Sequence, residues 1–218
     1  HYINVHTHKM SDYKYSVINL FPEETGQIKE NSFYSVGLHP WKVLNVDIEK
    51  SIDSVRKAVE LPNVFAVGEI GLDKYRDDFE LQKEIFLRQI DIAVQHKKPI
   101  VIHCVKAYSE LLSVLKEKQL KIPVIIHRYS GNKTVADQLI NFGCYLSFGH
   151  ELFNERSKVP RVFKNISEEH ILLETDDSEM SIEEIYNKAC ELRNLKLPEL
   201  QKRIIANFET CFKMKIDS

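Results

Sequence analysis

Short apolar runs rich in Val, Ile and Leu alternate with longer amphipathic segments along most of the chain. Such runs are typical of buried strands, whereas apolar residues spaced three and four apart are typical of helices that bury one face. The pattern predicts strands at residues 2–5, 13–20, 33–38, 64–67, 99–102, 124–126, 144–148 and 171–173. It predicts helices at residues 47–60, 78–96, 107–118, 133–142, 154–163, 181–193 and 197–214. Strands that alternate with helices indicate an α/β fold with a parallel sheet.

The number of strand and helix units favours a closed barrel of the TIM (β/α) type. The chain departs from this plan after its first strand, because only the short polar link at residues 9–12 precedes the second. Since a parallel connection normally needs a crossover helix, we expect the second strand either to run antiparallel to the first or to lie elsewhere. We therefore expect a barrel whose helix between the first two strands is missing or shortened, formed by residues 1–218 as a single domain.

Side chains that bind metals or take part in catalysis stand at the ends of several predicted strands. His6 and His8 flank Thr7, so on an extended strand both imidazoles point to the same side. Barrel enzymes build their sites at the carboxyl ends of the strands, so we expect the ligand-type residues there to converge. A shared site explains them better than core packing, because an unpaired buried His, Glu or Asp costs on the order of a few kcal/mol. These residues are His6, His8, Glu69, His103, His127 and Asp176.

The amino-acid composition limits the classes of protein to which this chain can belong. Hydrophobic residues make up 43% of the chain and charged residues 28%, which is ordinary for a globular protein. No apolar run approaches the roughly 20 residues of a membrane span, and the first residues lack the pattern of a secretion signal. We therefore expect a soluble cytoplasmic protein with no membrane partner and no obligate protein partner. Four widely spaced cysteines are expected to be buried reduced thiols, namely Cys104, Cys144, Cys190 and Cys211.

The net charge of −2 provides no global basic surface for nucleic acid. Basic residues nevertheless follow many of the predicted strand ends, namely Lys9, Lys42, Lys74, Arg76, Lys106, Arg128 and Lys133. On a barrel they would surround the site and create a local positive field; the alternative is that they are ordinary charged loop residues. Aromatic residues near the same ends either stack on nucleobases or pack against the protein, namely Trp41, Tyr75, Tyr108 and Tyr129.

Six short segments carry a resemblance to a known family. They are His6-Thr7-His8 and residues 37–40, 68–73, 102–103, 127–131 and 173–176, of which Gly-Glu-Ile-Gly-Leu-Asp at 68–73 is the most specific. In this order, along nearly the whole chain, they resemble the TatD family of metal-dependent deoxyribonucleases, within the amidohydrolase-like barrel superfamily. The resemblance implies a barrel hydrolase that cleaves phosphodiester bonds.

The resemblance also implies two adjacent divalent metal ions, with zinc, magnesium and manganese as candidates. Such ions bind phosphate oxygens, lower the pKa of a bound water and stabilise the leaving oxygen. Glu69 and Asp176 are the implied catalytic residues, and Asp176 is our candidate to orient or deprotonate the water. The implied ligands are His6, His8 and Asp176 for the first ion and His103 and His127 for the second, with Glu69 bridging both.

The sequence specifies the residues that contact the substrate less closely than it specifies the metal ligands. His39 either contacts the scissile phosphate or has a structural role in its Leu-His-Pro turn. The family has an Arg where this chain has Val105, so the phosphate contact of that Arg passes to Lys106 or Arg128 or is absent. The family's small residue and Pro after the last Asp are replaced by Asp177 and Ser178, which adds a carboxylate near an anion site. The expected substrate-binding residues are His39, Lys74, Arg76, Lys106 and Arg128.

The leading hypothesis is a metal-dependent deoxyribonuclease that acts on single-stranded DNA or DNA ends, because a deep metal site does not easily reach phosphates in an intact duplex. The second is a metallohydrolase of a small-molecule amide or ester, for which the same ligands would serve. Neutralising Lys74, Arg76 and Arg128 separates the two, because a small neutral substrate would hardly respond. The third is a relative without catalytic activity, which the complete ligand set disfavours.

Overall fold

The computed structural model describes residues 1–10 and 13–216 of the chain. Within this part the strands form one eight-stranded sheet, in which neighbours along the chain are also neighbours in the sheet. Every neighbouring pair is parallel, which is the arrangement of a (β/α) barrel. The strands are β1 (Ile3–Thr7), β2 (Tyr15–Leu20), β3 (Phe33–Val36), β4 (Val64–Asp73), β5 (Ile100–Val105), β6 (Val124–Ile126), β7 (Tyr145–Phe148) and β8 (Ile171–Leu173).

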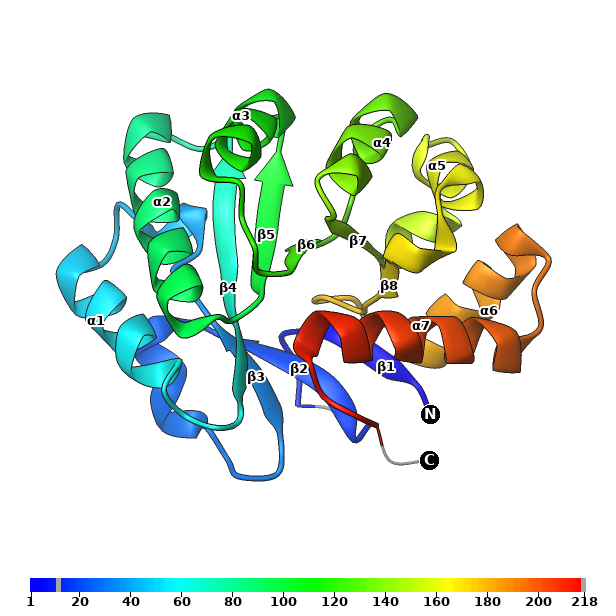
Figure 1. Ribbon diagram of the computed structural model, residues 1–218, viewed down its shortest axis with the longest axis horizontal. Helices are drawn as coiled ribbons and strands as arrows, with labels where there is room; N and C mark the ends of the chain where they lie inside the picture. Colours follow the sequence, from blue (N-terminus) through cyan, green and yellow to red (C-terminus); the bar gives the residue numbers. More distant parts are fainter. Residues whose placement is uncertain (11–12, 217–218) are drawn as a thin grey trace.

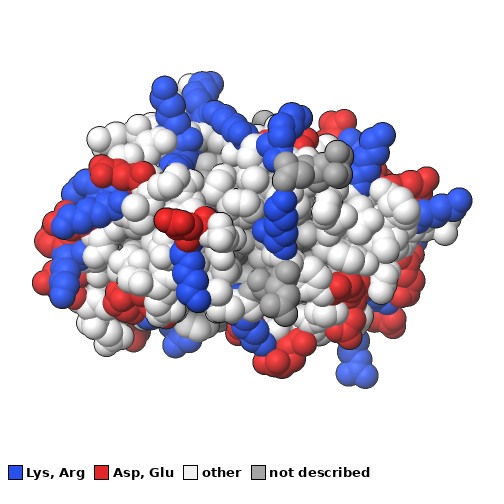
Figure 2. Space-filling model, turned by 90° about the horizontal axis from the view of Figure 1, so that it is seen from below, with Lys and Arg blue, Asp and Glu red and all other residues white. Residues whose placement is uncertain are grey.

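Helices cover the sheet unevenly. In Figure 1 the helices α2 to α5 stand beside the half formed by β4 to β8, whereas β1 to β3 form the lower side of the molecule. On the face seen from below, acidic and basic side chains are mixed around the edge and uncharged side chains fill much of the middle (Figure 2). The helices are α1 (Ile48–Ala58), α2 (Phe79–His96), α3 (Tyr108–Lys118), α4 (Lys133–Asn141), α5 (Val159–Asn165), α6 (Ile182–Arg193) and α7 (Leu197–Phe212).

The connection from β1 to β2 corrects one expectation from the sequence. The described residues between these strands contain no helix, as expected, but β2 pairs directly with β1 and runs parallel to it. Both alternatives, an antiparallel second strand and one placed elsewhere, are therefore wrong. Seven residues can reach about 25 Å when fully extended, which exceeds the roughly 15 Å along β1 that the chain must retrace. A helix is thus not needed for this crossover.

Local sequence signals place the helix ends well. The side chain of Asp47 accepts a hydrogen bond from the backbone of Lys50 at the start of α1, and Ser181 and Glu184 form a capping box at the start of α6. The helix predicted at residues 154–163 differs from the structure. A short 3-10 segment, η3 (His150–Phe153), comes first, and α5 begins only at Val159. Pro160 explains the late start, because proline favours the first turn of a helix.

Strands β4 and β5 continue further than the hydrophobic pattern predicts. β4 runs through the whole Gly-Glu-Ile-Gly-Leu-Asp segment to Asp73, and β5 includes His103, which pairs with Gly71. Gly71 has a φ of +154°, and a Cβ there would collide with the carbonyl oxygen of His103. Only glycine permits this close approach, so the sequence of the segment sets the position of His103 relative to β4.

The last and first strands meet through the segment that follows β8. Thr7 forms an isolated parallel bridge with Asp176, whose backbone N–H donates to the carbonyl of His6 at 3.0 Å. The backbone N–H of His8 donates in turn to the carbonyl of Asp176 at 3.3 Å. The barrel is nearly closed in this way. The same contacts bring His6 and His8, the first predicted ligands in the sequence, next to Asp176, the last one.

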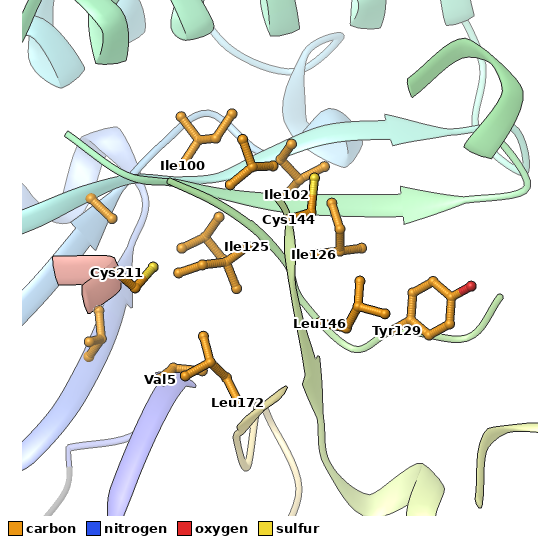
Figure 3. Packing of buried hydrophobic residues seen from close by; sticks show 14 of the residues in the cluster. Val5, Ile100, Ile102, Ile125, Ile126, Tyr129, Cys144, Leu146, Leu172 and Cys211 are labelled. Carbon is orange, nitrogen blue, oxygen red and sulfur yellow. The ribbon is translucent and has the colours of Figure 1, made fainter. Parts of the chain in front are cut away.

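Aliphatic side chains from the strands and the covering helices form one buried cluster. Val5, Ile125 and Leu172, from three different strands, belong to it and are fully buried (Figure 3). Three of the four cysteines are buried as predicted, and Cys190 is partly exposed. In the described part of the chain, no helix combines the length and the apolar character that a membrane crossing requires.

Candidate metal centre

The carboxylate of Glu69 stands at the centre of the predicted ligands. It lies on β4 with 2% of its surface exposed. Its Oε1 is 2.8 Å from Nδ1 of His103 on β5 and 3.1 Å from Nε2 of His127, which follows β6. The same oxygen lies 3.1 Å from Nε2 of His39, which follows β3. One oxygen of Glu69 therefore faces three histidines from three strand ends.

The other oxygen of Glu69 faces the first strand. Its Oε2 is 3.4 Å from Nε2 of His6 and 3.6 Å from Nε2 of His8. Both imidazoles also lie 3.5 Å from Oδ1 of Asp176. The two oxygens of Glu69 thus point to two different sets of ligand-type side chains, as a carboxylate that bridges two cations would.

Among the described residues there are three groups of three side chains that could hold a metal ion. Within each group the donor atoms lie within 4.8 Å of one another. Imidazole nitrogens together with carboxylate oxygens suit zinc and manganese, and the carboxylates also suit magnesium. The structure therefore brings together all six predicted metal ligands and places His39 beside them. The groups are His6, Glu69 and His127; His6, His8 and Asp176; and His39, Glu69 and His103.

His6 provides the test of whether a metal ion fits here. The residue is completely buried, yet neither of its ring nitrogens has a hydrogen-bond partner. A buried polar atom without a partner costs about 1–3 kcal/mol. Because its Nε2 faces two carboxylates at distances too long for a hydrogen bond of good geometry, a cation between these groups would satisfy all three side chains. The residues present fit a divalent metal.

Two further carboxylates orient the histidines. Glu174 accepts a hydrogen bond from Nδ1 of His127 at 2.8 Å, and Asp73 lies 3.2 Å from Nε2 of His103. When the site holds a cation, each contact would keep the ring proton on the carboxylate side, so that the other nitrogen, which faces Glu69, offers its lone pair to the ion. Our sequence interpretation assigned neither residue a role, although both lie in the segments that carry the family resemblance.

The buried charges shift one another's pKa values. For His6, burial and the charge of His127 lower the pKa, but the neighbouring Asp176 and Glu69 carboxylates outweigh them and raise it to about 9. Burial opposes ionisation of Glu69, yet the surrounding histidines hold its pKa well below the usual range. The Glu69 carboxylate therefore stays ionised at neutral pH, which is the state that binds a cation.

His39 behaves differently from His6. Burial dominates and lowers the pKa of His39 despite the nearby Glu69 carboxylate. Its Nδ1 accepts a hydrogen bond of 3.1 Å from the backbone N–H of Trp41, so in the neutral ring the proton is on Nε2. His39 therefore presents an N–H donor beside the metal ligands, and it also holds the turn that follows β3.

Comparison with known proteins agrees with this geometry. The family model described as TatD related DNase matches residues 15–213. The chain belongs to this family. An uncharacterized metal-dependent hydrolase of Buchnera aphidicola, BU355, is 31% identical over 158 residues, which cover 68% of this chain and 60% of that protein. A 3'-5' ssDNA/RNA exonuclease TatD of Edwardsiella piscicida is 28% identical over 166 residues, 73% of this chain and 63% of the relative.

The fold of the TatD family is also evident in solved structures. The crystal structure of the TatD homologue YjjV of Escherichia coli superposes with a TM-score of 0.82 at 23% identity, covering 91% of this chain and 86% of that one. The match shows that the barrel is that of the family. The chain spans only about three fifths of the length of the curated relatives BU355 and YabD of Bacillus subtilis, at 60% and 58%.

A cavity of about 530 Å³ opens onto the candidate metal centre of this TatD-family chain. Arg76 and Arg128 line it, whereas Lys74 and Lys106 do not. The ammonium group of Lys74 forms an ion pair with Glu110. Two of the four cationic residues predicted to bind substrate therefore lie on the cavity wall, and two lie outside it.

Arg128 is held between carboxylates at the cavity wall. Its Nη1 donates to Oδ2 of Asp176 at 3.2 Å, and its Nε pairs with Glu151 of η3. Other members of the predicted basic ring are also paired, namely Lys9 with Glu179, Lys42 with Glu23 and Lys133 with Asp137. Because these acidic partners cancel charge, the positive field around the site is weaker than the sequence alone predicts.

The four aromatic candidates divide into two pairs. Tyr129 is fully buried and Tyr108 is partly buried, and their rings lie 5.6 Å apart, so both pack within the protein. Trp41 is 50% exposed and Tyr75 is 72% exposed, and both line the cavity. Stacking on a substrate therefore remains open to the second pair.

Proposed function

We propose that this chain is a metal-dependent hydrolase that cleaves phosphodiester bonds of DNA, with single strands or strand ends as its substrate. The observation that carries the proposal is the position of Glu69, whose two oxygens face two separate sets of histidines. Two divalent ions, with zinc, magnesium and manganese as candidates, fit this arrangement. The family membership and the exonuclease named among the relatives support the same activity.

Each predicted ligand has a place in this proposal. His6, His8 and Asp176 would hold one ion, His103 and His127 the other, and Glu69 would bridge them. Bound ions would supply charge for the phosphate oxygens and would lower the pKa of a water molecule. Glu174 and Asp73 keep the rings of His127 and His103 in the orientation that binding requires.

In this proposal Asp176 would orient the attacking water. The His6 imidazole beside it and the charges of His6 and His127 outweigh the effect of burial and hold the pKa of Asp176 well below its usual range. One of its oxygens faces His6 and His8, and the other accepts from Arg128. An ionised carboxylate fixed in this way accepts a hydrogen bond from water and directs the lone pair of the water toward the phosphate.

Arg128 and His39 would bind the phosphate. Both line the cavity, and both carry N–H donors beside the metal ligands. Arg76 adds a second guanidinium to the same wall. Glu69 lines this cavity and is almost fully buried, so a flexible single strand would reach it more easily than a stiff duplex would.

Degradation of an end-labelled single-stranded oligonucleotide tests the proposal. The protein is loaded in turn with zinc, magnesium and manganese, and Glu69→Gln is purified in parallel. Glu80→Gln, the same chemical change at an exposed position of α2, is the matched control. We expect cleavage by the wild type and by Glu80→Gln, and at least a hundred-fold loss in Glu69→Gln.

The pattern of labelled products separates an exonuclease from an endonuclease. If no metal supports cleavage by the wild type, the deoxyribonuclease function is wrong, and hydrolysis of small-molecule esters and amides becomes the activity to test. If Glu69→Gln cleaves as fast as the wild type, the metal-dependent mechanism is wrong.

A further inference from the structure

Trp41 combines large exposure with a position beside the metal centre. It is the one tryptophan of the sequence and lies in η2 (Pro40–Lys42), directly after His39. Half of its surface is exposed, and it lines the same cavity as Glu69 and His103. An exposed aromatic ring on the wall of a polar cavity is costly in water and favourable against a flat apolar ligand.

The indole ring is held firmly in place. Its Nε1 donates a hydrogen bond of 2.6 Å to Oδ2 of Asp73, the carboxylate that also contacts His103. The ring packs edge-on against the rings of His39 at 5.1 Å and His103 at 5.7 Å. A ligand therefore meets a plane that is already oriented and loses little further conformational entropy on binding.

Arg76 stacks on one face of this ring. Its guanidinium carbon lies 4.2 Å from the centroid of the Trp41 ring, which is a cation–π contact. Across the described parts of the chain, Arg76 forms no ion pair with a carboxylate, in contrast to Arg128 and Lys42 on the same cavity wall. A guanidinium plane also stacks on nucleobases, and its charge favours the phosphates on either side of the base.

We propose that Trp41 and Arg76 form a binding site for one nucleobase next to the metal centre. The proposal rests on the function proposed above and specifies what the enzyme recognises: the base of a nucleotide whose phosphate reaches the metal ligands. The centroids of the Trp41 and His103 rings are only 5.7 Å apart. A nucleotide whose phosphate reaches His103 and the other proposed ligands would therefore have its base beside the indole. Because every base has a π-face, this contact selects nucleic acid over other esters without selecting a sequence.

Fluorescence tests base binding without any need for turnover. Since the chain contains a single tryptophan, emission excited selectively from tryptophan reports on Trp41 alone. The purified protein is titrated with deoxyadenosine 5'-monophosphate and, separately, with 2-deoxyribose 5-phosphate, which lacks only the base. We expect saturable quenching by the nucleotide and at least five-fold less by the sugar phosphate. Equal responses to the two, or none to the nucleotide, would overturn the proposal.

Kinetics on paired substrates tests the same site during cleavage. KM is measured for a single-stranded oligonucleotide and for one of the same length with abasic sites around the cleaved bond. We expect the wild type to favour the base-containing strand about ten-fold, within the range for stacking of a base on an aromatic side chain. In Trp41→Ala the ratio of the two KM values should fall to about one. Trp41→Phe keeps a ring but loses the hydrogen bond to Asp73, and it should retain most of the preference.

The ratio of the two KM values shows whether Trp41 recognises the base or has only a structural role. If Trp41→Ala lowers kcat equally on both substrates and leaves the KM ratio unchanged, Trp41 acts only by positioning Asp73 and His103, and the base site is wrong. If the wild type cleaves neither strand but the nucleotide still quenches Trp41 selectively, the proposed deoxyribonuclease function fails and the base site stands.

Discussion

The carboxylate of Glu174 accepts a hydrogen bond from Nδ1 of His127 at 2.8 Å, and the same oxygen accepts one from the backbone N–H of Arg128 at 2.9 Å. Glu174 is completely buried, and it therefore fixes both the ring of His127, a proposed metal ligand, and the backbone beside it. Such carboxylates raise the basicity of the histidine and hold its orientation, so their loss weakens metal binding even though they do not touch the metal.

Glu174→Gln is expected to weaken metal binding about ten-fold, because an amide oxygen still accepts both hydrogen bonds but carries no charge toward His127. Competition with a chromophoric chelator measures the metal affinity. The exposed Glu80→Gln serves as the matched control. Unchanged affinity in Glu174→Gln would show that the carboxylate has no part in metal binding.

Removing metal should lower the thermal stability of the protein. In the metal-free protein His6 has no hydrogen-bond partner, and the Glu69 and Asp176 carboxylates lie together in the site. A metal present at about a hundred times its Kd stabilises the folded state by about 2.7 kcal/mol. We expect Tm to rise by several degrees when zinc or manganese is added to chelator-treated protein and to rise much less for Glu69→Gln. Equal shifts for both proteins would place the binding elsewhere.

Salt dependence should distinguish the basic residues on the cavity wall from those outside it. Arg76 and Arg128 line the cavity, whereas Lys74 is paired with Glu110 outside it. Arg76→Gln and Arg128→Gln are each expected to weaken oligonucleotide binding and to reduce the slope of log affinity against log salt by about one. Lys74→Gln, the matched neutralisation, should leave the slope nearly unchanged. A large effect of Lys74→Gln would show that the substrate extends beyond the cavity.

Gly71→Ala should destabilise the fold strongly, because the new Cβ would meet the carbonyl of His103 at a φ that L residues rarely adopt. We expect a loss of roughly 3 kcal/mol in the free energy of unfolding, measured with denaturant. Gly26→Ala is the control, since no atom lies within 4 Å of the position of its added Cβ, and it should change stability by less than about 1 kcal/mol. Similar values for the two variants would contradict the close packing of β4 on β5.

The buried thiols predict a loss of stability at alkaline pH. Burial raises the pKa of Cys144 to about 12 and also raises that of Cys211. Because thiols of the unfolded chain titrate near pH 8.5, the contribution of each buried thiol is complete below that pH and is lost as pH rises. Between pH 8 and about 9.5 we expect each thiol to account for a decrease of about 1 kcal/mol. Unfolding of Cys144→Ala over the same range should show a correspondingly smaller decrease.

The order of strands and helices could be predicted because it depends on local patterns. The apolar runs of β4 to β8 and the caps at Asp47 and Ser181 act within a few residues, so neighbouring sequence is enough to locate them. The residues that meet at Glu69 could also be predicted, since the strand ends of a parallel barrel share one face whatever their separation in sequence.

Other features depend on distances that the order of residues does not specify. The short link after β1 was compatible with several placements of β2, and the parallel pairing follows from the geometry of the closed sheet. The basic residues after the strand ends looked alike in the sequence, but only the folded chain shows that Lys74 pairs with Glu110 while Arg76 stacks on Trp41. The sequence by itself thus determined the elements and the donor atoms of this protein. Only the tertiary structure decided which charges are cancelled and which aromatic ring remains open to a ligand, because both depend on contacts between residues far apart in the chain.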